Sequence, residues 1–128
     1  MGIVIIVMQA LSGLLLTFVG ASRLSNPIKT FSKSSGIELP EEVNVLNEAR
    51  GISAVQLLAG LLLLMGTFVD ALTAHALVVG TLLFLGFAVG RLISQRADGK
   101  PNPKLIQGLG FELVFGAANA FCLLQVVL

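Results

Sequence analysis

The sequence alternates four long apolar runs with polar segments. The runs cover residues 2–22, 51–69, 71–94 and 105–128. Each has about the 20 residues that a helix needs to cross the hydrocarbon core of a bilayer. Pro40, followed by Glu41 and Glu42, favours a helix start ahead of the second run, because these residue types suit a helix N-terminus. We therefore expect one continuous helix from about residue 41 to residue 69.

The segments between the runs differ in length and in turn-forming residues. Residues 23–40 are the longest polar segment, in which Ile28 and Phe31 predict only a short amphipathic turn at the membrane interface. Residues 70–73 predict a tight connection, and residues 95–104 predict a loop because they combine a glycine with two prolines. The pattern thus predicts four helices joined by one long and two shorter connections.

The first run has a competing interpretation as a secretory signal peptide, since Val19-Gly20-Ala21 resembles a cleavage site. No Lys or Arg precedes the run, however, and the run is longer than the apolar part of a signal peptide. We therefore interpret residues 2–22 as a membrane span.

Composition supports a membrane protein over an apolar soluble one. Hydrophobic residues make up 55% of the chain and charged residues 12%, about half of the charged fraction of a typical soluble domain. The mean hydropathy is +0.95, and the apolar residues stand in blocks. We expect residues 1–128 to form a single integral membrane domain, an all-α polytopic four-helix bundle.

The basic residues predict an orientation in the membrane. Those of the first and third connections are Arg23, Lys29, Lys33, Arg96, Lys100 and Lys104. The second connection and the regions beyond the first and last runs contain no Lys or Arg. The positive-inside rule then places both basic connections in the cytoplasm and both termini outside. A bacterial inner membrane is the expected location.

This topology gathers charged side chains at one face of the membrane. They are Arg23, Glu48, Arg50, Arg91 and Glu112. Glu112 lies roughly 10 Å along the fourth helix from Leu105, too deep to reach water freely. A carboxylate at that depth needs a partner, and an arginine fork pairs well with it. We expect Glu48, Arg50, Arg91 and Glu112 to form a cluster that is either a structural ion-pair network or a ligand site.

Small and polar residues at helical spacing predict inward-facing stripes. They are Gln9, Gly13, Gly20 and Arg23; Ala76, Gly80, Phe87 and Arg91; and Gly108, Glu112, Gly116 and Asn119. Arg23, Asn47, Asn119 and Gln9 are therefore further candidate contributors to the charge cluster. Gly86 and Gly90 form a small-xxx-small pair that allows another helix to approach.

Other residues carry less chemistry. Cys122 has no partner for an intrachain disulfide and is interpreted as a core or lipid-facing residue. His75 and Asp70 lie near the face opposite the cluster, where His75 is interpreted as an interfacial polar residue rather than a proton carrier or metal ligand. We expect no metal site and no cofactor, and the net charge of +1, without a basic cluster, predicts no nucleic-acid partner.

Several motifs resemble a known family. They are Gly20-Ala-Ser-Arg-Leu-Ser-Asn-Pro27, Leu46-Asn-Glu-Ala-Arg-Gly51, Gly90-Arg91 with Asp98-Gly-Lys-Pro101, and Glu112-Leu113. Together they resemble domain of unknown function 4345, a bacterial four-helix membrane family similar to DoxX-like proteins. The resemblance implies a four-helix inner-membrane bundle without a settled activity. Some DoxX-like relatives are associated with quinone-linked oxidoreductase complexes, but no residue of this chain indicates a redox site.

Three functions are compatible with these observations. The leading hypothesis is a non-enzymatic membrane protein that binds a lipid-like or polar ligand, or partner proteins, through the charge cluster. The alternatives are an oligomeric transporter or channel for an ion or small solute, and a subunit of a quinone-linked oxidoreductase complex. A pore predicts polarity across the whole membrane, whereas the outer halves of the first two runs are mostly Leu, Ile and Val. The glycine content favours self-association or membrane-protein partners besides the lipid bilayer.

Overall fold

The computed structural model describes residues 2–128, which form five helices and no strand. The helices are α1 (Gly2–Ser25), α2 (Pro27–Ser35), α3 (Val43–Gly66), α4 (Asp70–Asp98) and α5 (Pro103–Val127). All except α2 are long enough and apolar enough to cross a membrane. The predicted all-helical bundle of four membrane-spanning helices is therefore confirmed, and the protein is a multi-pass membrane protein.

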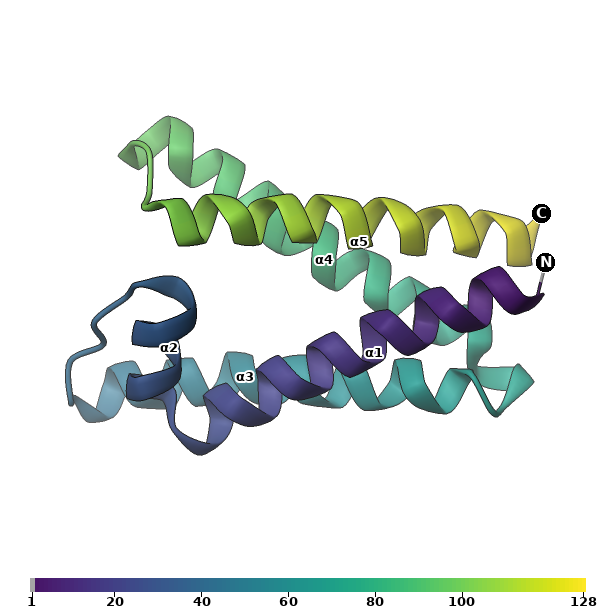
Figure 1. Ribbon diagram of the computed structural model, residues 1–128, viewed down its shortest axis with the longest axis horizontal. Coiled ribbons are helices and arrows are strands. Elements are labelled where there is room, and N and C mark those ends of the chain that lie inside the picture. The colour runs from purple at the N-terminus through teal and green to yellow at the C-terminus, as the bar shows by residue number, and fades with distance from the viewer. Residues whose placement is uncertain (1) are drawn as a thin grey trace.

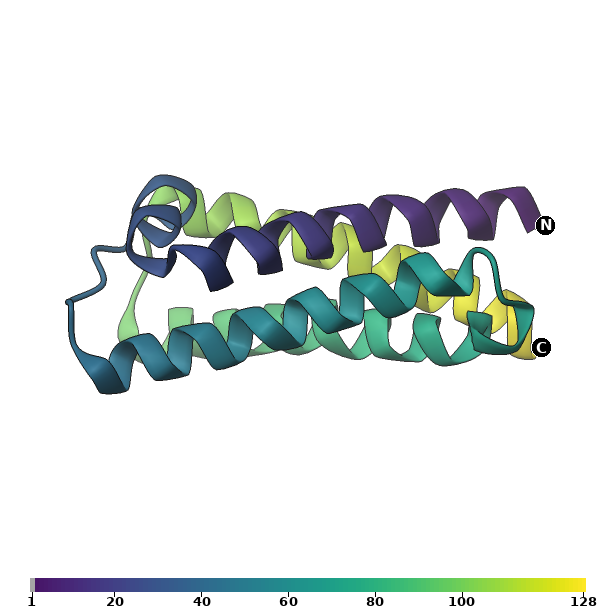
Figure 2. The same ribbon diagram turned by 90° about the horizontal axis from the view of Figure 1, so that it is seen from below.

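The long helices pack mainly as two antiparallel pairs, α1 with α3 and α4 with α5, and α3 also contacts α4 (Figures 1 and 2). We call one end of the bundle the terminal end: it holds the start of α1, the end of α5 and the turn between α3 and α4. The opposite end, which holds α2 and the loop between α4 and α5, is called the basic end. The side of the membrane that each end faces stays a prediction.

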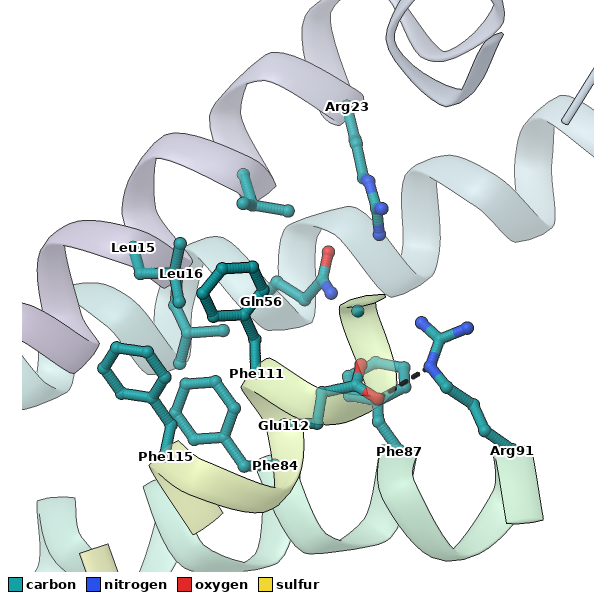
Figure 3. A pocket seen from close by; sticks show the side chains of 12 residues that line it. Leu15, Leu16, Arg23, Gln56, Phe84, Phe87, Arg91, Phe111, Glu112 and Phe115 are labelled. Carbon is teal, nitrogen blue, oxygen red and sulfur yellow. Dashed lines mark hydrogen bonds and ion pairs between the residues drawn. The ribbon is translucent and has the colours of Figure 1, made fainter. Parts of the chain in front are cut away.

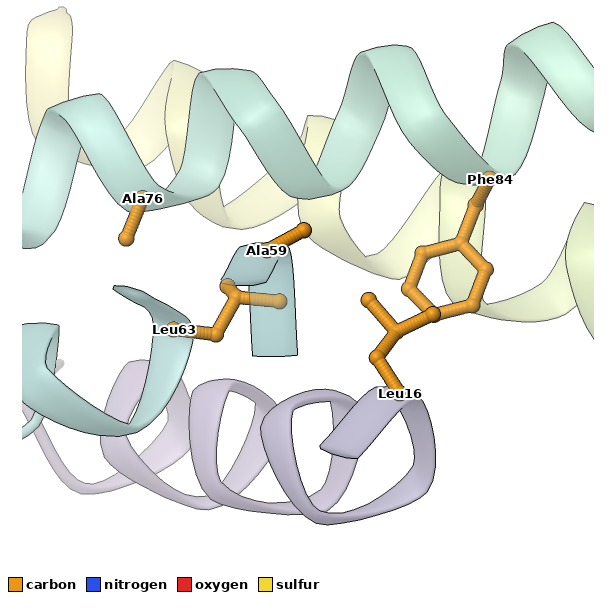
Figure 4. Close-up of a cluster of buried hydrophobic side chains, with 5 residues drawn as sticks. All are labelled: Leu16, Ala59, Leu63, Ala76 and Phe84. Atoms are coloured by element: carbon orange, nitrogen blue, oxygen red, sulfur yellow. The ribbon is translucent and has the colours of Figure 1, made fainter. Parts of the chain in front are cut away.

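The core lies where the two pairs meet. Figure 4 shows its main cluster, Leu16 of α1, Ala59 and Leu63 of α3, and Ala76 and Phe84 of α4. Large apolar side chains also cover the outside of the bundle, where a soluble protein would place charges. In a bilayer these side chains meet lipid tails, so their exposure to the surroundings costs little.

Small residues bring α1 and α3 into close contact. Gly20 lies against the backbone of Leu57, and Gly60 lies against the backbone nitrogen of Thr17. A methyl group on either glycine would collide with the neighbouring helix. Gly86 and Gly90 behave differently, because no other helix among the described residues comes within 4 Å of the Cβ position of either residue. The small-xxx-small pair of α4 therefore faces outward.

The start of α3 differs from the prediction. The helix begins at Val43 rather than at residue 41, because Glu42 is its N-cap. The Glu42 carboxylate accepts hydrogen bonds from the backbone nitrogens of Asn44 and Val45, at 3.1 and 3.0 Å. This satisfies donors that the first turn of a helix leaves free. The helix also ends three residues earlier than predicted, at Gly66, and residues 67–69 form the turn to α4.

The connection between α4 and α5 is shorter than predicted. Helix α4 continues to Asp98, four residues beyond the predicted span, and stops at Gly99, whose φ of 107° is unfavourable for other residues. Helix α5 begins at Pro103, two residues ahead of the predicted span, and Asn102 caps it by accepting from the nitrogen of Leu105 at 2.9 Å. The turn-forming residues predicted the position of this loop correctly, and the ends of the two helices define its length.

The polar segment after α1 contains a helix where the sequence predicted only a short amphipathic turn. Asn26 caps α2 through a hydrogen bond from the nitrogen of Lys29, and Pro27 occupies the first helical position. Gly36, at φ 66°, ends the helix in the left-handed conformation that glycine tolerates best. The caps at both ends make nine residues helical despite their low hydrophobicity.

Helix α2 is fastened to the start of α5. The Asn102 side-chain nitrogen donates to the carbonyl oxygen of Ser35 at 2.9 Å, and Lys104 Nζ donates to the carbonyl oxygen of Lys33 at 2.8 Å. Asn102 therefore caps one helix with its oxygen and holds another with its nitrogen. These contacts join α2 to the start of α5 at the basic end of the bundle.

Replacing Asn102 with alanine should destabilise the protein by about 1–2 kcal/mol, because the substitution removes an N-cap and a tertiary hydrogen bond. It should also speed cleavage of the native protein by trypsin after Lys33, since α2 loses one of its two hydrogen bonds to the start of α5. Thermal unfolding and limited proteolysis in detergent micelles measure the two effects. Asn44→Ala is the control, because Asn44 is exposed and outside these contacts. Equal behaviour of the two variants would contradict this role of Asn102.

Candidate functional site

A cavity of about 290 Å³ lies between the two helix pairs, toward the basic end of the bundle. All four long helices line it. In Figure 3 the charged side chains lie on one side, with Phe87 beside Glu112, and the leucines with Phe84, Phe111 and Phe115 lie on the other. The cavity is thus amphipathic, with a polar region formed by Arg23, Gln56, Arg91 and Glu112.

The ion pair between Arg91 and Glu112 joins α4 to α5 at this cavity. Arg91 Nε donates to Glu112 Oε1 at 2.7 Å, and the two side chains are 28% and 14% exposed. The pairing uses one edge of the guanidinium, and in Figure 3 its two terminal nitrogens point away from Glu112. The predicted partnership of Glu112 with an intramembrane arginine is therefore present, and Arg91 keeps further donors.

Arg23 brings a second guanidinium to the same cavity from the end of α1. Its Nη2 donates to Ser35 Oγ at 2.9 Å, and its guanidinium carbon lies 4.5 Å from the centre of the Phe31 ring. These contacts attach α1 to α2 and orient the arginine. Arg23 Nε is buried and has no hydrogen-bond partner among the described residues. The Arg23 side chain therefore retains an unused donor.

The polar region carries a net positive charge, because two arginines face one carboxylate. The low dielectric of a membrane interior strengthens electrostatic interactions between such groups and anything placed among them. Gln56 adds an amide that is 5% exposed, and its Oε1 is buried without a partner in the described structure. The site can thus accept an anion, while Gln56 can receive a hydrogen bond from a neutral group.

Aromatic side chains form the apolar region of the cavity. Phe84 of α4 and Phe115 of α5 are stacked, with ring centres 5.4 Å apart and planes inclined by 24°. Phe87 and Phe111 extend this wall, and Phe111 is 55% exposed on the outside of the bundle. A residue that both lines the cavity and faces outward places the cavity next to the lipid. The apolar region is therefore suited to a hydrocarbon chain.

Glu48 and Arg50, which were predicted to belong to the cluster, lie elsewhere. Along α3 the inward stripe runs through Ala49 and Ser53, and the residues on either side of Ala49 point about 100° away from it. Glu48 is exposed, and Arg50 Nη1 donates to the carbonyl oxygen of Leu24 at the end of α1. A cation suits that helix C-terminus. The predicted pairing of these two residues with Arg91 and Glu112 is wrong.

The additional candidates also separate. Asn47 is exposed on α3. Asn119 is fully buried and donates to Ser12 Oγ at 2.9 Å, about 10 Å along α5 from Glu112. Gln9 is fully buried at the terminal end, roughly 21 Å along α1 from Arg23. Of Arg23, Asn47, Asn119 and Gln9, only Arg23 lines the cavity. The half of the bundle toward the terminal end therefore contains buried polar groups, although the first two apolar runs are mostly Leu, Ile and Val there.

The remaining singled-out residues lie away from the cavity. His75 is exposed, and its Nδ1 is 3.1 Å from the carbonyl oxygen of Ala71 on its own helix. Cys122 is buried in a small cluster with Ile5 and Leu77, as one of the two environments predicted for it. Within residues 2–128 no group of three or more His, Cys, Asp or Glu side chains is placed to hold a metal ion.

Sequence reasoning missed part of the cavity. Gln56 has a recognisable signal, because it is the one amide in the apolar run 51–69. Phe87 was predicted as part of an inward stripe, whereas Phe84 and Phe115 have a weaker signal, at seven residues before Arg91 and three after Glu112. Such spacing is equally typical of ordinary core residues. Phe111 is the direct neighbour of Glu112 and has no such signal. Ser35, which binds Arg23, has no sequence signal at all.

Comparison with known proteins identifies one family. No curated protein and no solved structure matches the chain. The sequence matches the family described as domain of unknown function 4345 over residues 5–123, which include all four long helices in whole or in large part. The resemblance seen in the motifs around Arg23, Arg91 and Glu112 is therefore confirmed for that family, while the relation to DoxX-like proteins stays a prediction. The chain belongs to the domain of unknown function 4345 family.

Proposed function

We propose that this protein binds an amphiphile with an anionic head group in the cavity between the two helix pairs. The observation that carries the proposal is the arrangement of Arg23 and Arg91 around a single carboxylate, directly beside a phenylalanine wall. The arginines supply the charge for the head group, and the wall supplies an apolar surface for the chain. The protein would act in a bacterial cytoplasmic membrane with the basic end inside, as the positive-inside rule indicates.

The head group is expected between the two guanidinium groups. Arg23 has a buried Nε without a partner, and Arg91 contacts Glu112 through Nε only. A carboxylate or phosphate binds such donors through two parallel hydrogen bonds. Buried charges that lack a counterion are costly in a membrane, so an anion at this point would offset the net positive charge of the site.

The chain of the amphiphile is expected along Phe84, Phe111 and Phe115. The cavity volume of about 290 Å³ holds roughly ten groups of the size of a water molecule. This is enough for a head group and the first carbons of a chain. The rest of the chain would leave past Phe111, which is half exposed toward the lipid.

Binding can be tested with single-chain probes added to the protein in detergent micelles. The probes are oleate, oleoyl lysophosphatidate, neutral monooleoylglycerol and a short-chain ubiquinone. We expect oleate or the lysophosphatidate to bind at least about tenfold more tightly than the neutral glyceride, because a charge-assisted contact to arginine is worth about 1.5–3 kcal/mol. Native mass spectrometry measures the bound fraction of each probe and separates carboxylate from phosphate selectivity.

Charge variants make the test specific. Arg23→Gln should weaken anion binding, whereas Glu112→Gln should strengthen it, because that substitution removes the competing carboxylate and keeps a hydrogen-bond acceptor. Arg50→Gln is the matched control, since Arg50 lies outside the cavity. Tighter binding of the ubiquinone or of the glyceride than of both anions would overturn the proposal. So would equal effects of Arg23→Gln and Arg50→Gln.

A second candidate function is transport, and the buried Asn119–Ser12 hydrogen bond favours it. This polar pair lies between the cavity and the terminal end, separated from the cavity by Leu16 and the stacked Phe84 and Phe115 rings. The apolar layer would then be a barrier between two polar halves. Reconstituted vesicles test the idea: release of an encapsulated anion that Phe115→Ala increases and Phe121→Ala leaves unchanged would support transport. Phe121 is the control because it is exposed on the same helix.

A further inference from the structure

A second, smaller cavity opens at the terminal end of the bundle, far from the arginines. Its volume is about 150 Å³, and it lies between the start of α1, the end of α3 and the start of α4. Figure 2 shows how these three segments meet at that end. The cavity is independent of the proposed amphiphile site, because the two share no lining residue.

Gln9 lines this cavity, and its side chain has no hydrogen-bond partner among the described residues. Gln9 is fully buried, and both Nε2 and Oε1 are unsatisfied among residues 2–128. Buried amides are nearly always hydrogen-bonded, because unmade bonds are costly in an apolar environment. Gly66 makes room for this amide, since a Cβ atom at Gly66 would lie 2.5 Å from Gln9 Nε2. The arrangement holds a polar group in place with its bonding capacity unused.

The other polar groups of the cavity are mainly acceptors. Thr73 Oγ1 donates its hydrogen to the carbonyl oxygen of Gly66 at 2.9 Å, and Thr67 Oγ1 donates to that of Leu64 at 2.6 Å. Both hydroxyl oxygens therefore retain only accepting capacity. The carbonyl end of α3 points to this end of the bundle and carries partial negative charge, whereas the nearby starts of α1 and α4 carry partial positive charge, which Asp70 in the first turn of α4 offsets.

Among residues 2–128, one charged side chain lines the cavity, the exposed carboxylate of Asp70, and no Lys or Arg side chain does. The sequence has none between Arg50 and Arg91. A group that donates several hydrogen bonds would use Gln9 Oε1 and the threonine oxygens, and a positive charge on it would pair with Asp70. A primary ammonium group meets both conditions, with three N–H donors for Gln9 Oε1, the threonine hydroxyls and the Asp70 carboxylate.

We infer that the terminal end of this protein binds a primary ammonium group, with Gln9 as the buried acceptor and Asp70 as the counterion. The ammonium belongs to a small amine or to the head group of a lipid with an amino group. The volume admits the ammonium and a few further atoms, so any longer part of the ligand would lie outside the cavity.

The side-chain amide of Gln9 is a direct probe of occupancy. Protein labelled with ¹⁵N-glutamine in micelles is titrated with ethylammonium chloride, and the Gln9 signal is identified by its absence from Gln9→Leu. We expect a saturable shift of this signal. Asp70→Asn should raise the ethylammonium concentration at the midpoint roughly threefold, because an exposed ion pair changes binding affinity by about this factor. Glu48→Gln, which removes an exposed carboxylate at the basic end, should leave the midpoint unchanged.

Two salts separate an ammonium site from a general effect of positive charge or of ionic strength. Tetramethylammonium chloride carries the same charge without N–H donors, and potassium chloride at equal ionic strength controls for salt. No Gln9 shift with either salt supports the inference. An equal shift with tetramethylammonium or potassium overturns it, as does the absence of any shift with ethylammonium, which would mean that the cavity holds water only.

A stability measurement tests the same inference without the Gln9 signal. Ethylammonium should raise the Tm of the wild-type protein and of Gln125→Leu by similar amounts, because Gln125 is an exposed glutamine elsewhere on α5. It should leave the Tm of Gln9→Leu unchanged, although that variant is expected to fold, since leucine replaces an unsatisfied buried amide. A full Tm response of Gln9→Leu contradicts the site. Amphiphile binding at the arginines should be unaffected by Gln9→Leu, so failures of the two proposals are distinguishable.

Discussion

Replacing Gly20 with alanine should destabilise the folded protein by about 3 kcal/mol or more, because the added methyl group meets backbone that cannot move independently. The added Cβ atom would lie against the backbone nitrogen of Leu57. It would also lie 2.8 Å from the Cα of Leu57 and 2.8 Å from the carbonyl oxygen of Ser53. Helices α1 and α3 would have to separate along their main contact. Alanine is the better helix former by up to about 1 kcal/mol, so helix propensity alone would predict a gain in stability rather than this loss.

Unfolding of the protein by increasing SDS in mixed micelles measures this loss. Gly51→Ala is the matched control on α3, because no other helix among the described residues comes within 4 Å of its Cβ position, and this variant should be unchanged or slightly more stable. Gly13→Ala should fall between the two, since its nearest neighbour is the flexible side chain of Leu64 at 2.8 Å. A Gly20→Ala protein as stable as Gly51→Ala would show that α1 and α3 do not pack as described.

Replacing Glu112 with leucine should cost about 3 kcal/mol, the lower end of the range for breaking a buried ion pair. The substitution leaves Arg91 without its partner and removes the carboxylate from a cavity that Arg23 also lines. The lower end applies because the Arg91 side chain is 28% exposed. Unfolding in SDS micelles measures the change, in the absence of added amphiphile.

The double variant Glu112→Leu with Arg91→Leu distinguishes loss of an ion pair from loss of packing. It should recover a large part of the stability, because it removes the unpaired cation together with the carboxylate. Glu48→Leu is the control for a change of charge, since Glu48 is exposed, and its effect should stay within about 0.5 kcal/mol. A double variant less stable than the Glu112→Leu single variant would contradict this role of the pair.

Much of the architecture followed from local properties of the sequence. An apolar run such as residues 71–94 crosses the bilayer as a helix, because backbone N–H and C=O groups without hydrogen bonds are too costly inside the membrane. Helix ends were predicted less well. The start of α3 depends on whether Glu42 turns its carboxylate toward the next backbone nitrogens, and the end of α4 depends on the φ of Gly99. Residue type alone does not predict either feature, because glutamate and glycine also adopt other conformations.

In the candidate site, too, some contacts could be predicted from residue type and others could not. Glu112 was predicted to need an arginine, since an isolated carboxylate at its depth is too costly, and Arg91 meets it. Arg50 was an equally good partner by residue type and predicted depth. The angular position of Arg50 on α3 keeps it from Glu112, because the neighbouring Ala49 faces inward and Arg50 points about 100° away from it. The stripe through Ala49, Ser53 and Gln56 contains the required information, but only after α3 is known to pack on α1.

The sequence by itself determined that this chain is a membrane protein of four long helices with intramembrane charges that need partners. These properties depend on hydrophobicity summed over about 20 residues and on the cost of burying a charge, which are the same in any arrangement of the helices. Only the tertiary structure decided which charges meet, where α2 holds Arg23, and that Gln9 and Asn119 lie apart from the arginine cavity. Contacts between helices depend on the rotation of each helix about its axis. That rotation is set by close approaches such as Gly20 against Leu57, which form only when distant segments pack together.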